Sequence, residues 1–544
     1  MTLTSTPLPS NPLEPSIVIS SNAKRRRRPH PRSLLAISLF VVALLALPLA
    51  FLITEATNAG TSNVWHLIWR ALTATLLWNT VRLTVIVTIL CAIIGTLAAY
   101  FVERTDLPGR HIWAVLVVIP FAIPDFVVSF GWSSLSTWVQ GFRGAVLVMT
   151  LAVYPLVYLP VAASFRGADP GQEEIARSLG ASRLSTFVRI TLGQARRSIL
   201  GGCLLVALVI LAEYGAFEIL GYRTFTTEIF SEFNIGFDTA SACALSLVLV
   251  LLSFFVLFGE GSLRGRGHVA RSGPGVQRNV TRRPLGRAKI PVLFAFALLV
   301  GAALGVPVGS SIYWIFQGGA HSLSGVSLVS AALTTAGYSA AAALVATLLA
   351  LPVAVLVVRY PTRLRLLLAR STFLVLAMPG LVVALALTYF SEQHLGSYDY
   401  QTAPMLIFAY ALMFFPLALV GVRSSVAQAP LAIEEVANSL GVGRFGVFRR
   451  VTFPLVAPGL GAAFCLVFLS GVTELTATLI LIPTGAQTLA TQFWAYQQNL
   501  SYGQAAPFAL VMIAISAVPA YVLGRFFDRL PARSTSSPIN KVLT

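Results

Sequence analysis

Long apolar runs separated by short polar segments recur along the whole chain of 544 residues, and this pattern restricts the fold more than any other feature. A run of about 20 apolar residues is long enough for a helix to cross the hydrocarbon core of a membrane. With 56% hydrophobic and only 11% charged residues, the composition is not that of a soluble globular domain. The sequence therefore predicts an all-α polytopic membrane protein embedded in a lipid bilayer.

Six candidate spans precede a basic segment, and six follow it. The candidate spans lie at 34–53, 80–102, 112–132, 144–163, 199–220, 238–258, 290–309, 336–358, 371–390, 404–422, 459–482 and 507–525. We therefore expect about twelve transmembrane helices in two parallel six-span repeats.

The same runs divide the chain into five parts. These parts are a disordered basic cytoplasmic tail at 1–33, a first half at 34–258 with its core at 75–258, a basic cytoplasmic linker at 259–289, a second half at 290–525 with its core at 330–525, and a cytoplasmic tail at 526–544. The Gly- and Arg-rich linker lacks apolar periodicity, and we expect it to act only as a tether.

The basic residues fix the expected orientation. The chain has a net charge of +18, and its Arg residues gather in alternate loops between the apolar runs. This distribution follows the positive-inside rule and predicts that both termini lie in the cytoplasm. A nucleic-acid partner is not expected, because the charge is distributed over short loops between spans.

One polar stretch occurs twice, once in each half, between two spans. Several of its residues recur 261 positions later, as Glu174 does at Glu435 (435 − 174 = 261). The matched positions are Glu173, Glu174, Ala176 and Gly180 in the first copy and Glu434, Glu435, Ala437 and Gly441 in the second. By the charge rule both copies lie on the cytoplasmic side, where a soluble partner could bind them.

This pattern resembles the EAA loop of ABC-importer permeases, and the paired halves resemble fused permeases, most closely the ferric-iron transport group. One departure is Gly193, which stands where the family has Pro. The resemblance implies a type I ABC importer fold. It also implies a homodimer of ATPase subunits that binds the two loops at the cytoplasmic face, an extracytoplasmic substrate-binding protein, and transport by alternating access.

The chain is expected to hydrolyse no ATP itself and to bind no cofactor. A P-loop needs Lys followed by Ser or Thr after a Gly-rich turn, and the chain has no such motif. We therefore predict no catalytic residues and no metal site, and expect ATP to be used by the partner subunit. The likeness implies a translocation subunit in the bacterial inner membrane.

Three carboxylates within or near the apolar runs are candidates for the translocation path: Asp125, Glu213 and Glu474. A charge in a membrane span is costly and normally faces a cavity or a partner. Glu213 and Glu474 occupy matched positions, whereas Asp125 is matched by Gly380. The alternative interpretation is that the two Glu residues are structural and bond to an Arg or to the backbone.

The substrate is less constrained. Ferric iron is the best guess from the resemblance, and the alternatives are thiamine, phosphonate, sulfate or a polyamine. Two other classes are a secondary transporter of the major-facilitator type, which has no reason to carry the repeated loop, and a membrane enzyme, for which clustered catalytic residues are missing.

Overall fold

The computed structural model describes residues 32–58, 65, 69–168, 170–236, 238–263, 282–318, 325–360, 375, 378–394 and 401–529. Most of the predicted tails 1–33 and 526–544, and residues 264–281 of the predicted linker, lie outside these ranges. Within the described ranges the chain is helical and has no β-strand, which confirms the predicted all-α class.

The first half contains one long helix after another, interrupted by short ones. Its elements are α1 (Arg32–Asn58), α3 (Ala71–Arg104), α4 (Arg110–Leu116), η1 (Ile119–Ala122), α5 (Asp125–Ser133), η2 (Thr137–Val139), α6 (Gly141–Val153), α7 (Pro155–Arg166), α8 (Pro170–Ser178), α9 (Arg183–Thr186), η3 (Phe187–Thr191), α10 (Leu192–Ala212), α11 (Gly215–Ile219), α12 (Phe225–Asn234) and α13 (Thr239–Leu263).

The second half repeats this order with small differences. Its elements are η4 (Gly286–Ala288), α14 (Lys289–Val300), η5 (Gly301–Gly305), α15 (Val306–Gly318), α16 (Gly325–Arg359), α18 (Gly380–His394), α19 (Ala403–Met413), α20 (Phe415–Gln428), α21 (Leu431–Ser439), α22 (Arg444–Val447), η8 (Phe448–Thr452), α23 (Phe453–Val472), α24 (Thr476–Leu481), α25 (Leu489–Gln498) and α26 (Tyr502–Arg529).

The number of crossings agrees with the prediction only in part. Among the described residues, nine helical segments are long and apolar enough to cross a membrane, or up to eleven if each of two bent helix pairs is one span. The predicted span 371–390 falls partly on residues outside the described ranges. The count of twelve therefore stays a prediction.

Two predicted spans are sharply bent next to prolines. The region predicted as 112–132 bends by 93° between η1 and α5, where Pro124 precedes the first residue of α5. The helices α19 and α20 meet at 57°, and Pro416 lies at the start of α20. Proline lacks an amide hydrogen and clashes with the preceding turn, so a continuous helix is disfavoured at these points. Pro379, which lies 255 positions after Pro124 in the second half (379 − 124 = 255), likewise immediately precedes α18.

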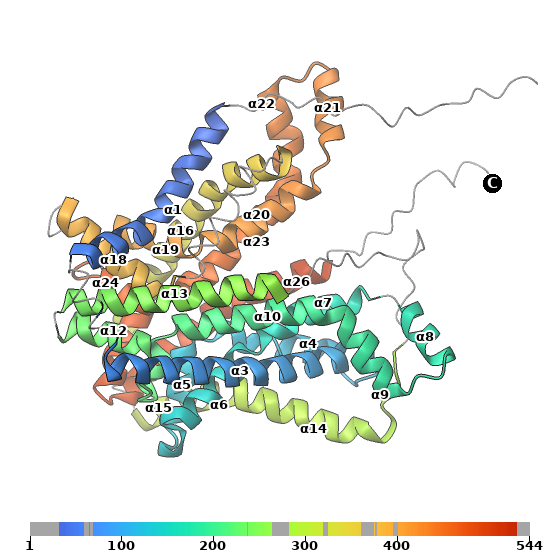
Figure 1. The fold of residues 1–544 in the computed structure, drawn as a ribbon, viewed down its shortest axis with the longest axis horizontal. Helices are drawn as coiled ribbons and strands as arrows, with labels where there is room; N and C mark the ends of the chain where they lie inside the picture. The colour runs from blue at the N-terminus through green and yellow to red at the C-terminus, as the bar shows by residue number, and fades with distance from the viewer. Residues whose placement is uncertain are drawn as a thin grey trace, which may run out of the picture.

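The two sequence halves interlock. Helix α1 packs on α16 and α18 of the second half, as Phe51 and Phe390 illustrate with ring centroids 5.7 Å apart. In return, α15 packs on α5 of the first half, and a methyl group on Gly131 would lie 2.7 Å from Pro307 Cα. Figure 1 shows α1 beside α16 and α14 beside the first-half helices. Helix α1 also packs on α13, and α15 also packs on α26, so each of these helices contacts both halves.

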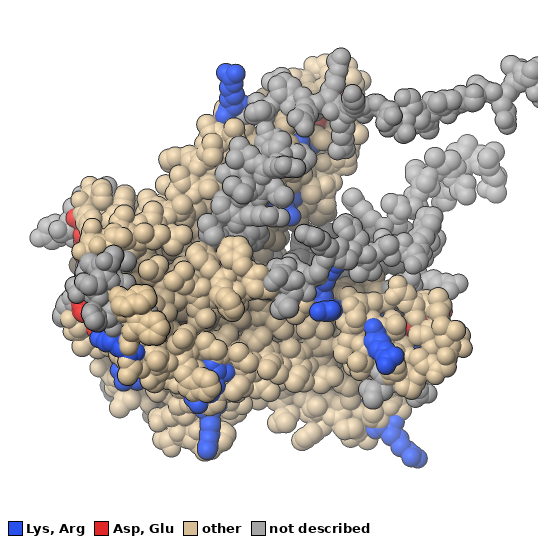
Figure 2. Space-filling view, viewed as in Figure 1, with Lys and Arg blue, Asp and Glu red and all other residues tan. Residues whose placement is uncertain are grey.

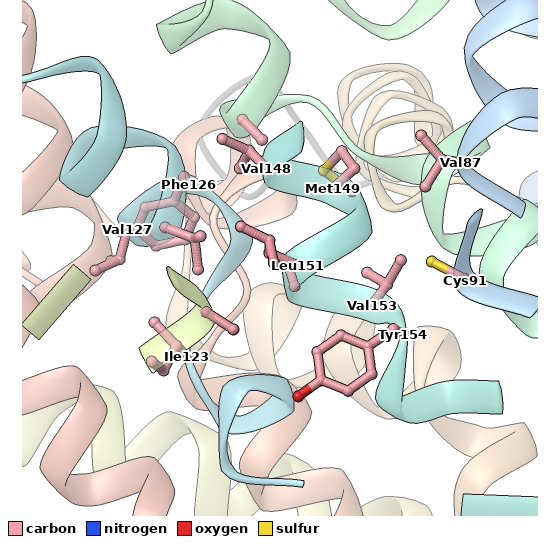
Figure 3. Packing of buried hydrophobic residues seen from close by; sticks show 14 of the residues in the cluster. Val87, Cys91, Ile123, Phe126, Val127, Val148, Met149, Leu151, Val153 and Tyr154 are labelled. Atoms are coloured by element: carbon pink, nitrogen blue, oxygen red, sulfur yellow. The ribbon is translucent and has the colours of Figure 1, made fainter. Parts of the chain in front are cut away.

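The interior of the first half is centred on α6. Its Val148, Met149 and Leu151 point among side chains of α3 and α5 (Figure 3). The Tyr154 hydroxyl, at the break between α6 and α7, donates to the Val117 carbonyl oxygen at 2.9 Å, so this buried polar atom has a partner. Close packing of this kind holds the elements that carry the candidate site.

Candidate functional site

The repeated polar stretches form two short helices, α8 and α21, beyond the ends of the long helices (Figure 1). We call them the coupling helices. Each has a Glu in its first turn, where the positive end of the helix dipole favours a negative charge. The family resemblance implied a helix at this place in each half, and both helices are present.

Each coupling helix ends at a glycine in the left-handed conformation. Gly180 has φ +87° and Gly441 has φ +83°. The amide of Ala181 donates to the Ala176 carbonyl oxygen at 3.0 Å, and the amide of Val442 donates to the Ala437 carbonyl oxygen at 3.2 Å. These bonds close a Schellman motif, in which glycine avoids the strain that a side chain would meet. The repeated glycine is therefore a helix terminator.

Each coupling helix exposes an apolar face. The exposed fractions are 61% for Ile175 on α8 and 82% for Leu179 directly after it, and 58% for Val436 on α21 and 76% for Leu440 directly after it. In each helix the two residues are four apart, so they lie on the same face. Two matched apolar faces outside the long helices are suited to binding another protein.

The paired glutamates point in different directions. Glu174 and Glu435 are exposed, whereas Glu173 is buried and Glu434 is half-buried. The side chains of consecutive helical residues point in directions about 100° apart, so two neighbouring residues cannot both point in the same direction. The sequence predicted that all four glutamates belong to the coupling loops, but it did not predict which of them are exposed and which are buried.

The inward-facing glutamates bond to the chain itself. Glu434 accepts from Arg359 Nη2 at 2.7 Å and from the Thr452 hydroxyl at 2.9 Å. Glu173 accepts from Arg104 and, at 2.8 Å, from the Thr191 hydroxyl. These Arg and Thr partners were not predicted as site residues, although the recurrence of Arg104 at Arg359 was a signal that could have found them. Ala176 and Ala437 are half-buried on the same helices.

The candidate path glutamates also occupy matched environments. Each follows a long helix and accepts a hydrogen bond from the amide of the second residue of a short one. The Ala216 amide donates to Glu213 at 2.7 Å, and the Ala477 amide donates to Glu474 at 3.0 Å. All three carboxylate residues, Asp125 included, are half-buried. The backbone contact that the structural interpretation expected is therefore present, and the partial exposure leaves room for the path interpretation.

The two halves meet where these carboxylates lie. Glu213 is within electrostatic range of both Asp125 and Glu474. A methyl group on Gly215, in the first half, would lie 2.6 Å from Leu475 Cδ2, in the second half. The helix breaks after Glu213 and Glu474 thus approach each other across the interface between the halves. Among the described residues, no group of three or more His, Cys, Asp or Glu side chains could hold a metal ion.

A cavity of about 460 Å³ lies next to Glu213, between α11, α12 and α25. Sequence reasoning missed it, because its walls come from both halves. Its lining residues include Tyr214, Glu218, Tyr222, Glu228 and Trp494. It lies at the end of the molecule away from the coupling helices, where acidic side chains gather at the left edge of Figure 2.

The chain matches one protein family twice. The family model described as "Binding-protein-dependent transport system inner membrane component" matches residues 91–261 and 343–535. The two matches fall in the two predicted halves, and together they cover more than half of the chain.

Similar proteins of known name are transport permeases. The Fe(3+)-transport system permease protein FbpB 2 of Haemophilus influenzae is 37% identical over 485 residues, which span 89% of this chain and 96% of that protein. The ferric transport system permease protein FbpB of Actinobacillus pleuropneumoniae is 23% identical over 83% of this chain and 70% of that protein. The sulfate transport system permease protein CysT of Salmonella typhimurium is 27% identical over 42% of this chain and 90% of that protein.

Proposed function

Because the chain belongs to the family of binding-protein-dependent transport system inner membrane components, we propose that its two coupling helices bind an ATPase homodimer at the cytoplasmic face. The chain is the permease of an ABC importer, a translocation subunit and not an enzyme. This identity decides against the major-facilitator alternative. ATP is used by the partner subunit, and the chain itself binds no cofactor.

The observation that carries the ATPase proposal is the matched pair of exposed apolar faces on α8 and α21. Two copies of one ATPase present the same groove twice, and a permease with the same helix twice can fill both grooves. The exposed Glu174 and Glu435 add charge at matched places on these helices. A homodimer therefore fits the repeat better than two unrelated subunits.

The orientation follows from the same helices. If the coupling helices lie on the cytoplasmic side, the start of α1 and the Arg-rich segments near the linker lie on that side too. This placement agrees with the positive-inside rule. Both termini are then cytoplasmic, and the cavity beside Glu213 faces an extracytoplasmic binding protein. Twelve crossings complete this arrangement.

Ferric iron is the substrate that these observations favour. A relative that is 37% identical over nearly its whole length carries that name. The cavity lining includes the Glu218 carboxyl group and the Tyr214 phenol, and oxygen ligands suit hard cations. Arg223 also lines the cavity and bonds to Glu228 at 3.1 Å. The carboxyl groups of Glu213, Glu474 and Asp125 offer oxygen atoms to a cation and no positive charge to an oxyanion such as sulfate or phosphonate. Thiamine and polyamines, which are cationic, remain the alternatives.

The proposed cycle is alternating access. ATP binding closes the ATPase dimer and draws α8 and α21 together. The two halves then rotate relative to each other until the translocation path opens toward the binding protein. Because the halves interlock through α1 and α15, they move as two bodies made of both sequence halves. Hydrolysis and product release restore the inward-facing state.

Uptake into proteoliposomes tests this function. The chain is reconstituted with its ATPase and supplied outside with the Fe³⁺-loaded binding protein, and radioactive iron is counted inside. We expect uptake that requires ATP and the binding protein, with radioactive sulfate and spermidine as competing substrates. Uptake of sulfate or spermidine without iron would refute the substrate, and iron uptake without ATP would refute the ATPase mechanism.

A further inference from the structure

Two clusters that share an Arg, a Glu and a Thr lie beside the coupling helices, the first buried and the second half-buried. The first cluster contains Arg104, Glu173, Thr191 and Arg283, and the second contains Arg359, Glu434 and Thr452. The Glu and Thr positions recur after 261 residues, and the Arg positions 104 and 359 recur after 255. An arrangement that occurs twice with the same atoms is unlike a chance surface ion pair.

The second cluster shows the basic arrangement. Glu434 Oε1 accepts from Arg359 Nη2 at 2.7 Å and from Thr452 Oγ1 at 2.9 Å. Arg359 is the last residue of α16, and Thr452 is the last residue of the π-helical turn η8. One carboxylate thus joins the coupling helix α21 to two other elements of its half.

The first cluster has the same three groups and one more. Glu173 accepts from Arg104, the last residue of α3, and from Thr191, the last residue of the π-helical turn η3. Its other oxygen, Oε2, accepts from Arg283 Nη2 at 2.7 Å. The side chains of Arg104 and Glu173 are only 4% and 8% exposed. Among the described residues, no second cationic group joins the second cluster.

Arg283 belongs to the predicted linker and is held firmly in place. Its amide donates to the Arg104 carbonyl oxygen at 2.9 Å, and its carbonyl oxygen accepts from the Asp106 amide at 3.1 Å. The Leu285 amide and the Lys289 amine bond to the two oxygens of Asp106 at 2.7 and 3.0 Å. The expectation that the linker is only a tether is therefore wrong for its described end, residues 282–289.

The π-helical turns give a second, independent indication of function. A π-helical turn is rare, and such turns occur frequently at functional sites. Among the described residues one such turn, η5, lies between α14 and α15, away from the coupling helices, and the other two occupy matched positions, Phe187–Thr191 and Phe448–Thr452. In each of these two, the terminal threonine is the residue that bonds to the inward-facing glutamate.

These contacts determine how a coupling helix can move. A buried carboxylate that loses a cationic partner is strongly destabilised, so the pairs resist separation. Glu173 and Glu434 carry no exposed surface comparable to that of Glu174 and Glu435, and so are poorly placed to bind the partner. Through these ion pairs, a displacement of α8 also moves the end of α3, and a displacement of α21 also moves the end of α16.

We propose that Glu173 and Glu434 are positioning residues that fix each coupling helix to the end of the first core helix of its half, and that Arg283 fastens the linker to the first coupling helix. The proposal rests on the ABC-importer function. It makes the two coupling helices unequal, because only the first cluster includes the linker among the described residues.

Hydrogen–deuterium exchange of the purified chain tests the linker contact without substrate or ATPase. In Arg283→Ala, we expect amides of α8 to exchange about tenfold faster, as loss of a buried charge-assisted bond implies. Amides of α21 serve as the control within the same molecule and should not change. Arg287→Ala, an exposed linker position, is the matched variant and should leave both helices unchanged. Unchanged exchange in α8, or an equal change in α8 and α21, would overturn the role of Arg283.

The second cluster provides the test of positioning, because it has a single Arg. In the complete complex, Glu434→Gln should retain the ATPase in pull-down but lower the transport per ATP hydrolysed by about fivefold or more. Arg359→Lys keeps the positive charge, so this variant should retain part of the coupling between transport and ATP hydrolysis. The neutral pair Arg359→Gln with Glu434→Gln removes the unpaired charge, so protein level should recover while transport per ATP stays low.

Three results would contradict the proposal. The first is unchanged transport per ATP in Glu434→Gln. The second is loss of ATPase binding in that variant, which would place Glu434 at the partner interface. The third is a neutral pair that restores coupling, which would mean a structural role only. Failure of the ABC function itself is distinguishable, since then the unaltered chain would neither bind the ATPase nor transport.

Discussion

At the scale of single residues, the structure separates roles that the sequence had combined. Glu173 and Glu174 are neighbours in one motif, yet one is buried against Arg104 and the other is exposed. The motif predicts that a Glu is needed and that a helix forms, but it does not say which way each side chain turns. That direction depends on where the helix packs, and Arg104 lies 69 residues away in the sequence.

Gly180 gives a prediction at this scale. Its φ of +87° places it where a side chain is strained by roughly 1–2 kcal/mol, although a methyl group there would meet no atom within 4 Å. Gly180→Ala should therefore fray the end of α8, with faster exchange of the Ala181 amide. Gly193→Ala is the matched control, because Gly193 is also free of neighbours within 4 Å but is helical. Equal exchange in the two variants would contradict the helix-terminator role.

The outward-facing glutamates carry a second prediction. Glu174→Ala with Glu435→Ala should weaken capture of the ATPase by about tenfold or more, because two charge-assisted contacts at the interface are lost. The amount of protein in the membrane should stay normal, since both residues are exposed. Glu392→Ala, exposed near the end of α18 and remote from the coupling helices (Figure 1), is the control. Normal capture by the double variant would remove the main support for these helices as the docking site.

At the scale of elements, hydropathy predicted where helices exist but not where they bend. The candidate span 112–132 is apolar throughout, and the chain turns by 93° within it. Pro124 signals the possibility of a break, but its angle is set by packing against α6 and α15. The same limit explains the cavity beside Glu213, whose walls come from α11, α12 and α25. No local pattern in the sequence joins these three helices.

The contact between the linker and the end of α3 predicts a pH dependence. The Leu285 amide, followed by Lys289, lowers the pKa of Asp106 below its ordinary value of 3.8. A carboxyl with a lowered pKa stabilises the folded contact above its ordinary pKa, and this contribution is lost as the pH falls through the folded pKa. The contact should therefore be constant from neutral pH down to 3.8 and weaken only below that value.

Spin labels at Arg110→Cys and Arg287→Cys measure this contact as a distance. The distance distribution should broaden below pH 3.8 in the otherwise unaltered chain. Asp106→Asn, which cannot ionise, should be broadened already at neutral pH and show no further change. Broadening of the unaltered chain near pH 6, the range in which His titrates, would mean that another group controls the contact.

At the scale of the whole molecule, the sequence predicted two parallel repeats, and the family matches at 91–261 and 343–535 agree with two halves. It did not predict that the halves interlock through α1 and α15. Lipid and the surface of a neighbouring helix are both apolar, so a hydrophobic run does not reveal which of them it faces. The buried residues Val41, Leu45 and Leu52 of α1 became visible as packing residues only in the structure.

Interlocking leads to a prediction about a divided chain. If the polypeptide is cut within 264–281 and both parts are expressed together, they should copurify, and transport should stay within about twofold of the intact chain. The reason is that α1 of the first part buries its face on α16 and α18, while α15 of the second part packs on α5. Arg283 remains on the second part and can still reach Glu173.

A shortened first part tests whether the interlocking causes this assembly. Removing residues 1–58 deletes α1 and the three buried side chains by which it packs, Val41, Leu45 and Leu52. The shortened part should then copurify much less with the second part, while retaining α3 to α13. Equal recovery with and without α1 would mean that this helix does not hold the halves together. Failure of the full-length parts to copurify would mean that the linker is required for assembly, beyond the contact of its end with Glu173.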